Sequence, residues 1–298
     1  MNSQVFAHAL ALITVFVWGL TFISTKVLLV SFTPLQILFM RFVLGFVVLC
    51  VLSPHFLKLR DRKHELLFAA AGLTGTVIYY LSENIALMYA DASFVSVAVS
   101  TAPLFTAILG FAVLKEKGFG PLFVLGFVLA IVGTAFTCVQ GSAVSSTYAT
   151  PLGVALCLAA AVSWAVYSLI VKKLSNLGYA TIASTKRTFA WGLLFMAVIL
   201  VFKNEPWDVG ALAEVQNWGN LLFLGAMASA GCFVTWGLAV SRLGATMASA
   251  YIYLTPPITV VAGVIILGEP FTPLIGLGVA LVLIGLVLSE LPQRTTKQ

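Results

Sequence analysis

Four polar side chains gather in one otherwise apolar stretch of the sequence, at Tyr79, Tyr80, Glu83 and Asn84. On a helix, residues 80, 83 and 84 would share one stripe, because side chains three and four positions apart are neighbours. The Glu83 carboxylate could hold an ammonium group or act as a proton site. If this helix lies in a bilayer, the stripe must face protein or water, and an ionisable group there is a functional candidate because its insertion costs about 2.5 to 3.5 kcal/mol.

Arg41 is a second ionisable residue within an apolar run, and its side chain could hold a carboxylate. At 1.5 Å per residue, Glu83 lies about 9 Å from the near end of its run and Arg41 about 12 Å from the corresponding end of its own. The matching depths predict either an ion pair or two groups that face one wet vestibule. Two alternatives stay open, a purely structural pair and an arginine whose side chain reaches back to the interface.

Trp18 and Trp164 each lie thirteen residues from the start of their apolar runs, about 20 Å along a helix. This depth places neither residue in an interfacial aromatic belt. We expect both indoles to line a cavity, where their N–H donors would be used. The alternative is that both residues only pack inside a helix bundle.

Pro103 and Pro256 fall in the middle of two further apolar runs, where proline removes a backbone hydrogen bond and frees a carbonyl group. They predict bends or hinges around a cavity, with a static kink as the alternative. Tyr251 and Thr255 are four residues apart beside the second proline, so on a helix they would share one face. Their hydroxyl groups are predicted to belong to the same site.

The composition of the chain requires a bilayer around these residues. Of 298 residues, 61% are hydrophobic and only 9% are charged, whereas soluble domains carry about 25% charged residues. Soluble enzymes, nucleic-acid-binding proteins and secreted disulfide scaffolds are therefore excluded. All four cysteines lie in apolar stretches, which indicates neither a metal site nor a disulfide, and we expect no cofactor.

Ten apolar segments of membrane-spanning length are separated by charged residues or by Gly, Pro and Ser. They are continuous rather than alternating, which excludes barrel strands and predicts an all-α integral membrane protein with ten transmembrane helices. The first segment is expected to remain as a helix rather than to be cleaved as a signal peptide, since no basic region precedes it. The approximate ranges are 5–29, 33–53, 65–89, 93–114, 121–140, 151–171, 179–202, 218–241, 245–267 and 272–290.

Basic residues are divided unequally between the two sides that these segments define. With the N-terminus inside, eleven Lys and Arg fall in cytoplasmic loops and the tail, against only Lys26 and Lys203 outside. This excess predicts that both termini are cytoplasmic, in a bacterial inner membrane, and explains most of the net charge of +6 without a nucleic-acid partner. The eleven are Lys58, Arg60, Arg62, Lys63, Lys115, Lys117, Lys172, Lys173, Arg242, Arg294 and Lys297.

The second half of the sequence repeats the first. One offset of 146 residues aligns several residues early in each half, and an offset of 153 aligns 92–103 with 245–256. The chain is therefore predicted to be two five-helix repeats, residues 1–141 and 142–298. Because five is odd, the second repeat is inverted, and a pseudo-two-fold axis puts equivalent residues on facing walls of a central site. The early pairs are Trp18 with Trp164, Lys26 with Lys172 and Arg41 with Arg187.

Short motifs recur in both halves. The first half contains Trp18-Gly19, Arg41-Phe42, Ala86-Leu87, Ala92-Ser93, Pro103 and Leu114-Lys115-Glu116, and the second contains Trp164-Ala165, Arg187-Thr188, Leu243-Gly244-Ala245, Pro256 and Leu267-Gly268-Glu269-Pro270. With these motifs the whole chain resembles the EamA family of ten-helix carriers in the drug/metabolite transporter superfamily. Within it, the sequence is most similar to bacterial aromatic amino acid exporters. The halves differ at Arg187-Thr188 and at Trp236, which aligns with Glu83, so the two walls need not share chemistry.

The resemblance and the polar residues at depth predict a secondary transporter that exports small organic solutes, above all aromatic or bulky apolar amino acids, by alternating access. A broad-specificity drug or metabolite exporter is the alternative. An intramembrane transferase would need paired acids or a metal cluster, and Glu83 is the one clearly intramembrane carboxylate, so we do not expect an enzyme. The sequence has no Walker A motif, which excludes direct use of ATP.

Glycines are frequent in the fifth and tenth segments, and they permit close approach of helices. Packing within the chain is the favoured interpretation, so we expect a monomer; a homodimer through these helices is the alternative. The glycines are Gly126, Gly133, Gly276, Gly278 and Gly285.

Overall fold

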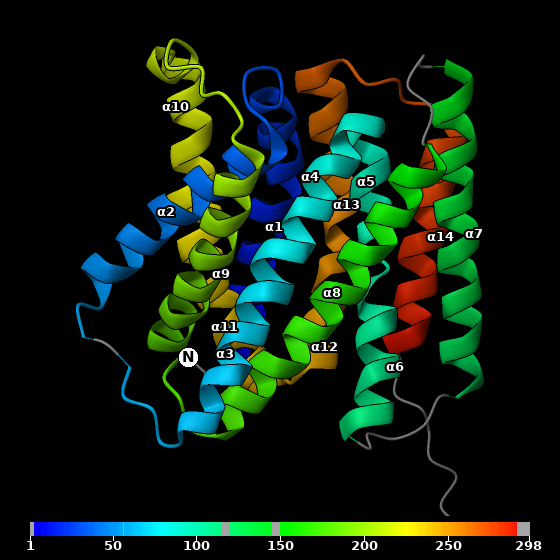
Figure 1. The fold of residues 1–298 in the computed structure, drawn as a ribbon. Helices are drawn as coiled ribbons and strands as arrows, with labels where there is room; N and C mark the ends of the chain where they lie inside the picture. The colour runs from blue at the N-terminus through cyan, green and yellow to red at the C-terminus, as the bar shows by residue number, and fades with distance from the viewer. Residues whose placement is uncertain (1–2, 56, 115–119, 145–149, 291–298) are drawn as a thin grey trace, which may run out of the picture.

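The computed structural model describes residues 3–55, 57–114, 120–144 and 150–290. These residues form a bundle of helices that run between two ends of the molecule, with no strand in the described chain (Figure 1). Eight described helices are long and apolar enough to cross a membrane, and Pro121–Gly133 and Pro273–Gly285 are shorter apolar helices. The prediction of an all-α membrane protein with ten transmembrane helices is confirmed.

The first half supplies five spans, two of which are irregular in the middle. The third span contains a π-helical stretch, and the fourth is broken just before Pro103. The elements are α1 (Ser3–Leu28), α2 (Pro34–Leu52), a 3₁₀ turn (Arg62–His64), α3 (Glu65–Gly72), the π-helical stretch (Leu73–Ile78), α4 (Tyr79–Tyr89), α5 (Ala92–Val99), α6 (Ala102–Leu114) and α7 (Pro121–Val144).

The second half repeats this order and its irregularities. The eighth span contains a π-helical stretch, and the ninth changes to a 3₁₀ helix just before Pro256. The elements are α8 (Pro151–Asn176), α9 (Thr181–Lys203), a 3₁₀ turn (Ala211–Ala213), α10 (Val215–Leu222), a π-helical stretch (Phe223–Gly231), α11 (Cys232–Leu243), α12 (Ala245–Ala250), a 3₁₀ helix (Tyr251–Leu254), α13 (Thr255–Ala262), a π-helical stretch (Gly263–Leu267) and α14 (Pro273–Glu290).

Helices of the two halves pack in matched pairs. α4 packs on α8, and its counterpart α11 packs on α1. In the same way α6 packs on α8 and α13 on α1, while α2 packs on the π-helical stretch of the eighth span and α9 on that of the third. A pseudo-two-fold axis between inverted repeats produces this exchange of partners. The division of the chain at residue 141 stays a prediction.

α7 and α14, the last helix of each half, lie side by side at one edge of the bundle (Figure 1). A Cβ atom added to Gly133 would collide with the carbonyl oxygen of Gly278, and one added to Gly285 would collide with that of Gly126. Only glycine allows the two backbones to touch at these points. The prediction that the glycines serve packing within the chain is confirmed, whereas the oligomeric state stays a prediction.

α8 continues to Asn176, so Lys172 and Lys173 lie in its last turns and not in a loop as predicted. The helix continues because a long lysine side chain can carry its charge away from the apolar face. Lys172 illustrates this, since its Nζ donates to the carbonyl oxygen of Ser241 at 3.2 Å. The predicted loop residues Lys115 and Lys117 and the tail residues Arg294 and Lys297 lie outside the described residues.

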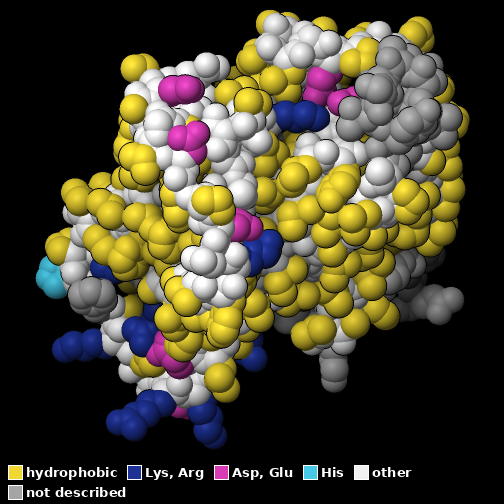
Figure 2. All heavy atoms as spheres, turned by 45° about the horizontal axis from the view of Figure 1, so that its top comes forward, with side chains coloured by type: hydrophobic (Ala, Val, Ile, Leu, Met, Phe, Trp, Pro, Cys, Tyr) yellow, Lys and Arg dark blue, Asp and Glu magenta, His cyan; other side chains and the backbone are white. Residues whose placement is uncertain are grey.

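The surface has two polar ends on either side of an apolar middle. Figure 2 shows Lys and Arg side chains gathered at its lower end. The segment before α3 lies at the lower end of Figure 1, and it contains the exposed residues Lys58, Arg60, Arg62 and Lys63. The segment around α10 lies at the opposite end, where Asp208 and Glu214 are exposed (Figure 1). We call the first of these the basic end.

Candidate functional site

A central cavity lies between α1, α4, α8 and the two broken spans. Its volume is about 20 Å³, which leaves room for about one water molecule. The side chains have therefore closed on one another, and a solute of amino-acid size requires the helices to move apart. Six predicted site residues are among the lining residues, which are Trp18, Thr21, Phe22, Tyr79, Tyr80, Glu83, Val99, Ser100, Ala102, Trp164, Ile252 and Thr255.

Trp18 and Trp164 meet in the wall of this cavity. Their ring centroids are 5.0 Å apart and their planes are perpendicular, which is the edge-to-face geometry that aromatic pairs prefer. The Trp18 indole N–H donates to the carbonyl oxygen of Ala228 at 3.2 Å. The buried Trp164 indole nitrogen has no hydrogen-bond partner within the described residues. Both residues thus pack and line the cavity, and Trp164 keeps a donor that a ligand could use; its use by a substrate stays a prediction.

Glu83 brings a buried carboxylate to the cavity from α4. The side chain is 1% exposed, and its Oε1 atom has no hydrogen-bond partner among the residues that the structure describes. The Tyr79 hydroxyl, one turn earlier on the same helix, lies against the carboxylate. A buried carboxylate oxygen without a donor is costly, so a ligand that brought a cationic donor to Oε1 would be stabilised strongly.

Arg41 is fully buried on α2, behind the cavity wall. Its guanidinium carbon lies 4.3 Å from the ring centroid of Tyr80, and its Nε donates to the hydroxyl of Ser229 at 3.0 Å. The two terminal nitrogens have no hydrogen-bond partner in the described part of the chain. Because none of the side chain is exposed, the alternative that it reaches back to the interface is wrong.

Arg41 and Glu83 do not form the direct ion pair that was one of the two predicted arrangements. In the described ranges, no nitrogen of Arg41 lies within 4.0 Å of a Glu83 oxygen. Tyr80 prevents the pair, because its ring stacks on the guanidinium and its side chain also lines the cavity. Glu83 faces the cavity directly, whereas Arg41 would reach it only if Tyr80 moved.

Asn84 and Tyr251 do not line the central cavity. Asn84 Nδ2 donates to the carbonyl oxygen of Pro34 at 3.2 Å, which fastens α4 to the start of α2. The Tyr251 hydroxyl instead lies 2.6 Å from Nδ1 of His8. The expectation that Tyr251 shares a face with Thr255 is wrong, because the 3₁₀ stretch winds three residues per turn and rotates a residue four positions earlier by about 120° rather than about 40°.

Pro103 and Pro256 each occupy the second position of the helix that follows a break, in α6 and α13. A proline there needs no N–H partner, whereas the preceding helix must end because the ring would clash with the carbonyl group four residues earlier. At the first break Thr101 Oγ1 donates to the carbonyl oxygen of Ala98 at 2.7 Å. Within α13, one turn after the second break, Thr259 Oγ1 donates to the carbonyl oxygen of Gly19 on α1 at 2.8 Å. The breaks face the cavity, and their role as hinges stays a prediction.

Trp236 is the main feature of the site that the predicted residue set lacked. It is completely buried on α11, its ring lies 5.1 Å from that of Trp18, and its indole nitrogen has no hydrogen-bond partner in the described chain. The repeat offset contained the signal, because Trp236 aligns with Glu83 and so faces it across the axis. Phe233 and Tyr167 extend the same aromatic cluster.

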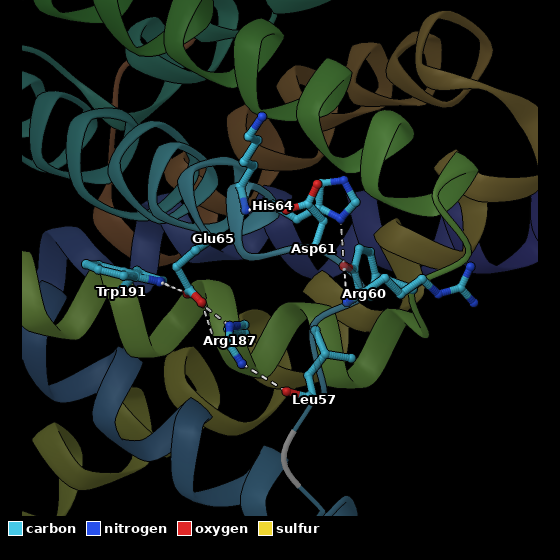
Figure 3. A network of polar contacts seen from close by, with 9 residues as sticks. Leu57, Arg60, Asp61, His64, Glu65, Arg187 and Trp191 are labelled. Atoms are coloured by element: carbon cyan, nitrogen blue, oxygen red, sulfur yellow. Dashed lines mark hydrogen bonds and ion pairs between the residues drawn. The ribbon is translucent and has the colours of Figure 1, made fainter.

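A second charged cluster lies at the basic end (Figure 3). Arg187 on α9 forms a two-point ion pair with Glu65 at the start of α3, with Nε donating to Oε1 at 2.9 Å. Trp191 donates its indole N–H to Oε1 at 2.5 Å, and Arg187 Nη1 donates to the carbonyl oxygen of Leu57 at 3.0 Å. Glu65 was not singled out in the sequence because it stands at the edge of its segment.

The ionisable groups are too dispersed for a metal centre in the part of the chain that the structure describes. No group of three His, Cys, Asp or Glu residues there could hold a metal ion. What the central cavity offers is one carboxylate, unpartnered donors and aromatic surface, which together suit a small solute with a cationic group and an apolar part.

Comparisons with known proteins find matches that cover nearly the whole chain. The sequence profile of the EamA-like transporter family matches residues 5–139 and 151–291. A "probable terminal-alkyne amino-acid exporter" of Streptantibioticus cattleyicolor is 30% identical over 97% of this chain and 93% of its own. An uncharacterized transporter of Archaeoglobus fulgidus is 27% identical over 93% of this chain and 95% of its own.

Two further matches agree with these. A "probable amino-acid metabolite efflux pump" of Escherichia coli is 25% identical over 97% of this chain and 96% of its own. A solved crystal structure superposes with a TM-score of 0.69 over 97% of this chain and 96% of that chain, at 19% identity, which shows a shared fold. These three relatives are named as a transporter, an exporter and an efflux pump, and none of the three names is that of an enzyme.

Proposed function

The chain belongs to the EamA-like transporter family, and from this premise we propose that it exports amino acids with aromatic or bulky apolar side chains by alternating access. It is a multi-pass membrane protein that carries small molecules outward, as the names of its relatives indicate, and it is not an enzyme. The side-chain class of the cargo is the new part of the proposal.

One observation carries the choice of cargo: the unpartnered Oε1 of Glu83 lies in a cavity whose wall contains the Trp18 and Trp164 indoles. An α-ammonium group would give Glu83 a charge-assisted hydrogen bond. An aromatic or branched side chain would lie against the indoles, where stacking contributes about 0.5 to 1.5 kcal/mol beyond the burial of apolar area.

The carboxylate of an amino acid also finds donors on the cavity wall. Trp164 has an unpartnered indole N–H and Thr255 an unpartnered hydroxyl, and both residues line the cavity. Arg41 lies behind Tyr80 and would supply positive potential to the site, or a direct contact once Tyr80 turned aside. We therefore assign the ammonium group to Glu83 and the carboxylate to the side of Trp164 and Thr255.

Transport would proceed by opening the two broken spans in turn. Pro103 and Pro256 directly follow the lining residues Ala102 and Thr255 on opposite repeats, so bending at one break would open one side while the other stays closed. The exposed basic residues before α3 support a cytoplasmic position for the basic end, in a bacterial inner membrane with both termini inside. Outward movement then runs from the basic end toward α10.

Flux into proteoliposomes tests the proposal with a matched set of solutes. Tryptophan, phenylalanine and leucine are expected to be carried faster than alanine and glutamate. Indole-3-propionate, which keeps the indole ring and the carboxylate and lacks the ammonium group, is expected to fail. Equal flux of tryptophan and indole-3-propionate would refute the role of Glu83 as an ammonium site.

A broad-specificity exporter is the second candidate, because the cavity lining is predominantly aromatic and aliphatic. Such a surface accepts many apolar solutes when hydrogen bonds do not select among them. The same assay separates the two candidates through tryptamine, which keeps the ammonium group and the ring and lacks the carboxylate. A broad exporter carries tryptamine as fast as tryptophan, and an amino-acid exporter does not.

A further inference from the structure

A second cavity, of about 260 Å³, lies at the basic end between α2, the segment before α3, and α9. None of its lining residues also lines the central cavity, so it is separate from the proposed transport site. We call it the lateral cavity. Its lining residues are Phe46, Leu57, Glu65, Ala183, Lys186, Arg187, Ala190, Trp191 and Leu194.

The polar wall of the lateral cavity carries a net positive charge, since Lys186 and Arg187 face a single acid, Glu65. Of the five N–H donors of Arg187, one on Nε, one on Nη1 and one on Nη2 are taken by Glu65 and Leu57 (Figure 3). One donor on each terminal nitrogen remains for an anion. Glu65 holds the guanidinium in place, and its two oxygens are already occupied by Arg187 and Trp191.

Lys186 adds a nearly buried cation to this wall. The residue is 2% exposed, and its Nζ donates to the carbonyl oxygens of Ser53 and His55, the second at 2.8 Å. A cation held this far from water draws an anion more strongly than an exposed lysine would.

The apolar wall continues the lipid-facing side of α9. Ala190 and Leu194 are exposed and four residues apart, and the exposed Val198 extends the same stripe. The lateral cavity thus opens sideways onto the apolar surface and not toward the centre of the bundle. A ligand that fits this opening has an anionic head and an apolar tail.

The position of the charges along α9 suits a lipid headgroup. Lys186 and Arg187 lie about 8 to 9 Å from the first residue of the helix, and Leu194 lies about 20 Å from it, at 1.5 Å per residue. The cations are therefore near the depth of the headgroups and Leu194 is within the hydrocarbon layer. The exposed Lys58, Arg60 and Arg62 nearby add to the positive potential.

We propose that the lateral cavity binds an anionic phospholipid, with the phosphodiester at Lys186 and Arg187 and one acyl chain against Phe46 and Leu194. Basic pockets between transmembrane helices hold such headgroups. The bound lipid joins α2 to α9, two helices that belong to different halves of the chain. This inference does not depend on the identity of the transported solute.

Native mass spectrometry of the detergent-purified full chain tests the proposal. Phosphatidylglycerol and phosphatidylcholine with identical acyl chains are added at equal concentration. We expect phosphatidylglycerol adducts to exceed phosphatidylcholine adducts by about fivefold. This ratio corresponds to the attraction of one basic residue to an anionic lipid surface. Equal retention of the two lipids by the unmodified protein would refute the proposal, whatever the variants do.

Two pairs of variants locate the binding. Ala190→Trp fills the lateral cavity without changing charge, and its matched control is Val198→Trp, two turns along the same exposed stripe and outside the lining. Lys186→Gln removes a charge inside the cavity, and Lys58→Gln removes one from the exposed segment nearby. We expect the first of each pair to lose the preference for phosphatidylglycerol and the second to keep it.

Circular dichroism and elution as a single species check that each variant is folded. If Lys186→Gln does not fold, the comparison of Ala190→Trp with Val198→Trp decides the matter. Retention of the full preference in Ala190→Trp would place the lipid elsewhere and overturn the proposal. Loss of the preference in both tryptophan variants would overturn it as well, since binding would then follow the whole face of α9.

Discussion

Arg41 and Arg187 occupy equivalent positions in the two halves and have opposite surroundings. Arg187 is paired at two points with Glu65 and also bonds Leu57. Arg41 has one neutral partner, Ser229, and two terminal nitrogens without partners, and it is buried completely. Arg187 therefore forms a structural contact at the periphery of the bundle, whereas Arg41 supplies a positive charge without a direct acidic partner next to the central cavity.

The difference follows from the acids, not from the arginines. At the offset of 153 residues, Glu65 corresponds to Trp218 and Glu83 corresponds to Trp236. The acid that pairs with Arg187 and the acid nearest Arg41 thus both stand in the first half, and in the second half a tryptophan occupies each equivalent position. Repeated folds keep the helix positions, whereas single side chains decide which copy becomes a binding site and which a structural contact.

The two acids provide the largest expected effect. Glu83→Gln should raise the half-saturating concentration for exchange of aromatic amino acids by about 10- to 100-fold, because a hydrogen bond to a charged group contributes about 1.5 to 3 kcal/mol. Glu65→Gln should leave that concentration within about twofold, since Glu65 lies outside the central cavity. Exchange at equal pH in proteoliposomes measures both.

Glu83→Asp is the control for this pair, because it keeps the charge and shortens the side chain. If Glu83 serves only proton coupling, Glu83→Gln keeps exchange at equal pH and loses only the response of flux to a pH gradient. That result would refute the role of Glu83 as the ammonium site.

The two arginines should respond differently to the same substitution. Arg187→Met should lower the free energy of unfolding by about 1 to 3 kcal/mol, because Glu65 and Trp191 lose a charged neighbour. Arg41→Met should not lower it, since relief of a buried charge, worth several kcal/mol, exceeds a cation–π contact with Tyr80 worth about 2 kcal/mol or less. Thermal unfolding in detergent measures both changes.

The double variant Glu83→Gln with Arg41→Met sharpens this result. If Glu83 stabilises Arg41 across Tyr80, Glu83→Gln alone destabilises the protein and the double variant recovers much of the loss. A stability loss in Arg41→Met as large as in Arg187→Met would mean that Arg41 is as well paired as Arg187.

Two tryptophans extend the comparison to apolar contacts. Trp164→Ala should reduce aromatic flux by about 2- to 10-fold more than it reduces folded yield, from a stacking energy of about 0.5 to 1.5 kcal/mol. Trp164→Phe keeps an aromatic ring and removes the indole N–H, so it should recover the stacking part of the loss and not the hydrogen bond to the carboxylate. Trp191→Ala, which removes a donor to Glu65, should change stability and leave the preference for aromatic cargo unaltered. Parallel loss of yield and flux in Trp164→Ala would assign that residue to packing alone.

The smallest effect is expected from cysteine labelling, which should leave flux and stability unchanged. Asp208→Cys and Arg62→Cys place thiols on exposed residues at opposite ends of the molecule. A membrane-impermeant reagent applied outside right-side-out vesicles should label position 208 and spare position 62. The reverse pattern would place the basic end outside the cell. It would also exchange the membrane faces nearest to Arg41 and Arg187.

Sequence periodicity and charge predicted the helices well, because a bilayer demands long apolar segments and leaves their number visible. The central placement of Trp18 and Trp164 followed from the repeat, and that of Glu83 followed from the polar stripe on its helix. The sequence did not predict that residues 251–254 form a 3₁₀ helix, because this change in helix type depends on the break before the proline. The 3₁₀ helix directs the Tyr251 hydroxyl toward His8. Nor did the sequence predict the position of Tyr80 between Arg41 and Glu83, because equal depth along two helices does not fix the angle at which their side chains face.

The backbone contact of α7 with α14 has a mechanical consequence. The two backbones are in contact at two places along the helices, Gly133 with Gly278 and Gly285 with Gly126. Sliding of one helix along the other would break both close contacts, so the two helices must separate before either one can slide. No described residue of either helix lines the central cavity, so this joint need not open when cargo passes. If transport proceeds as proposed, these two helices therefore stay fixed as a pair while the other spans move around the cavity.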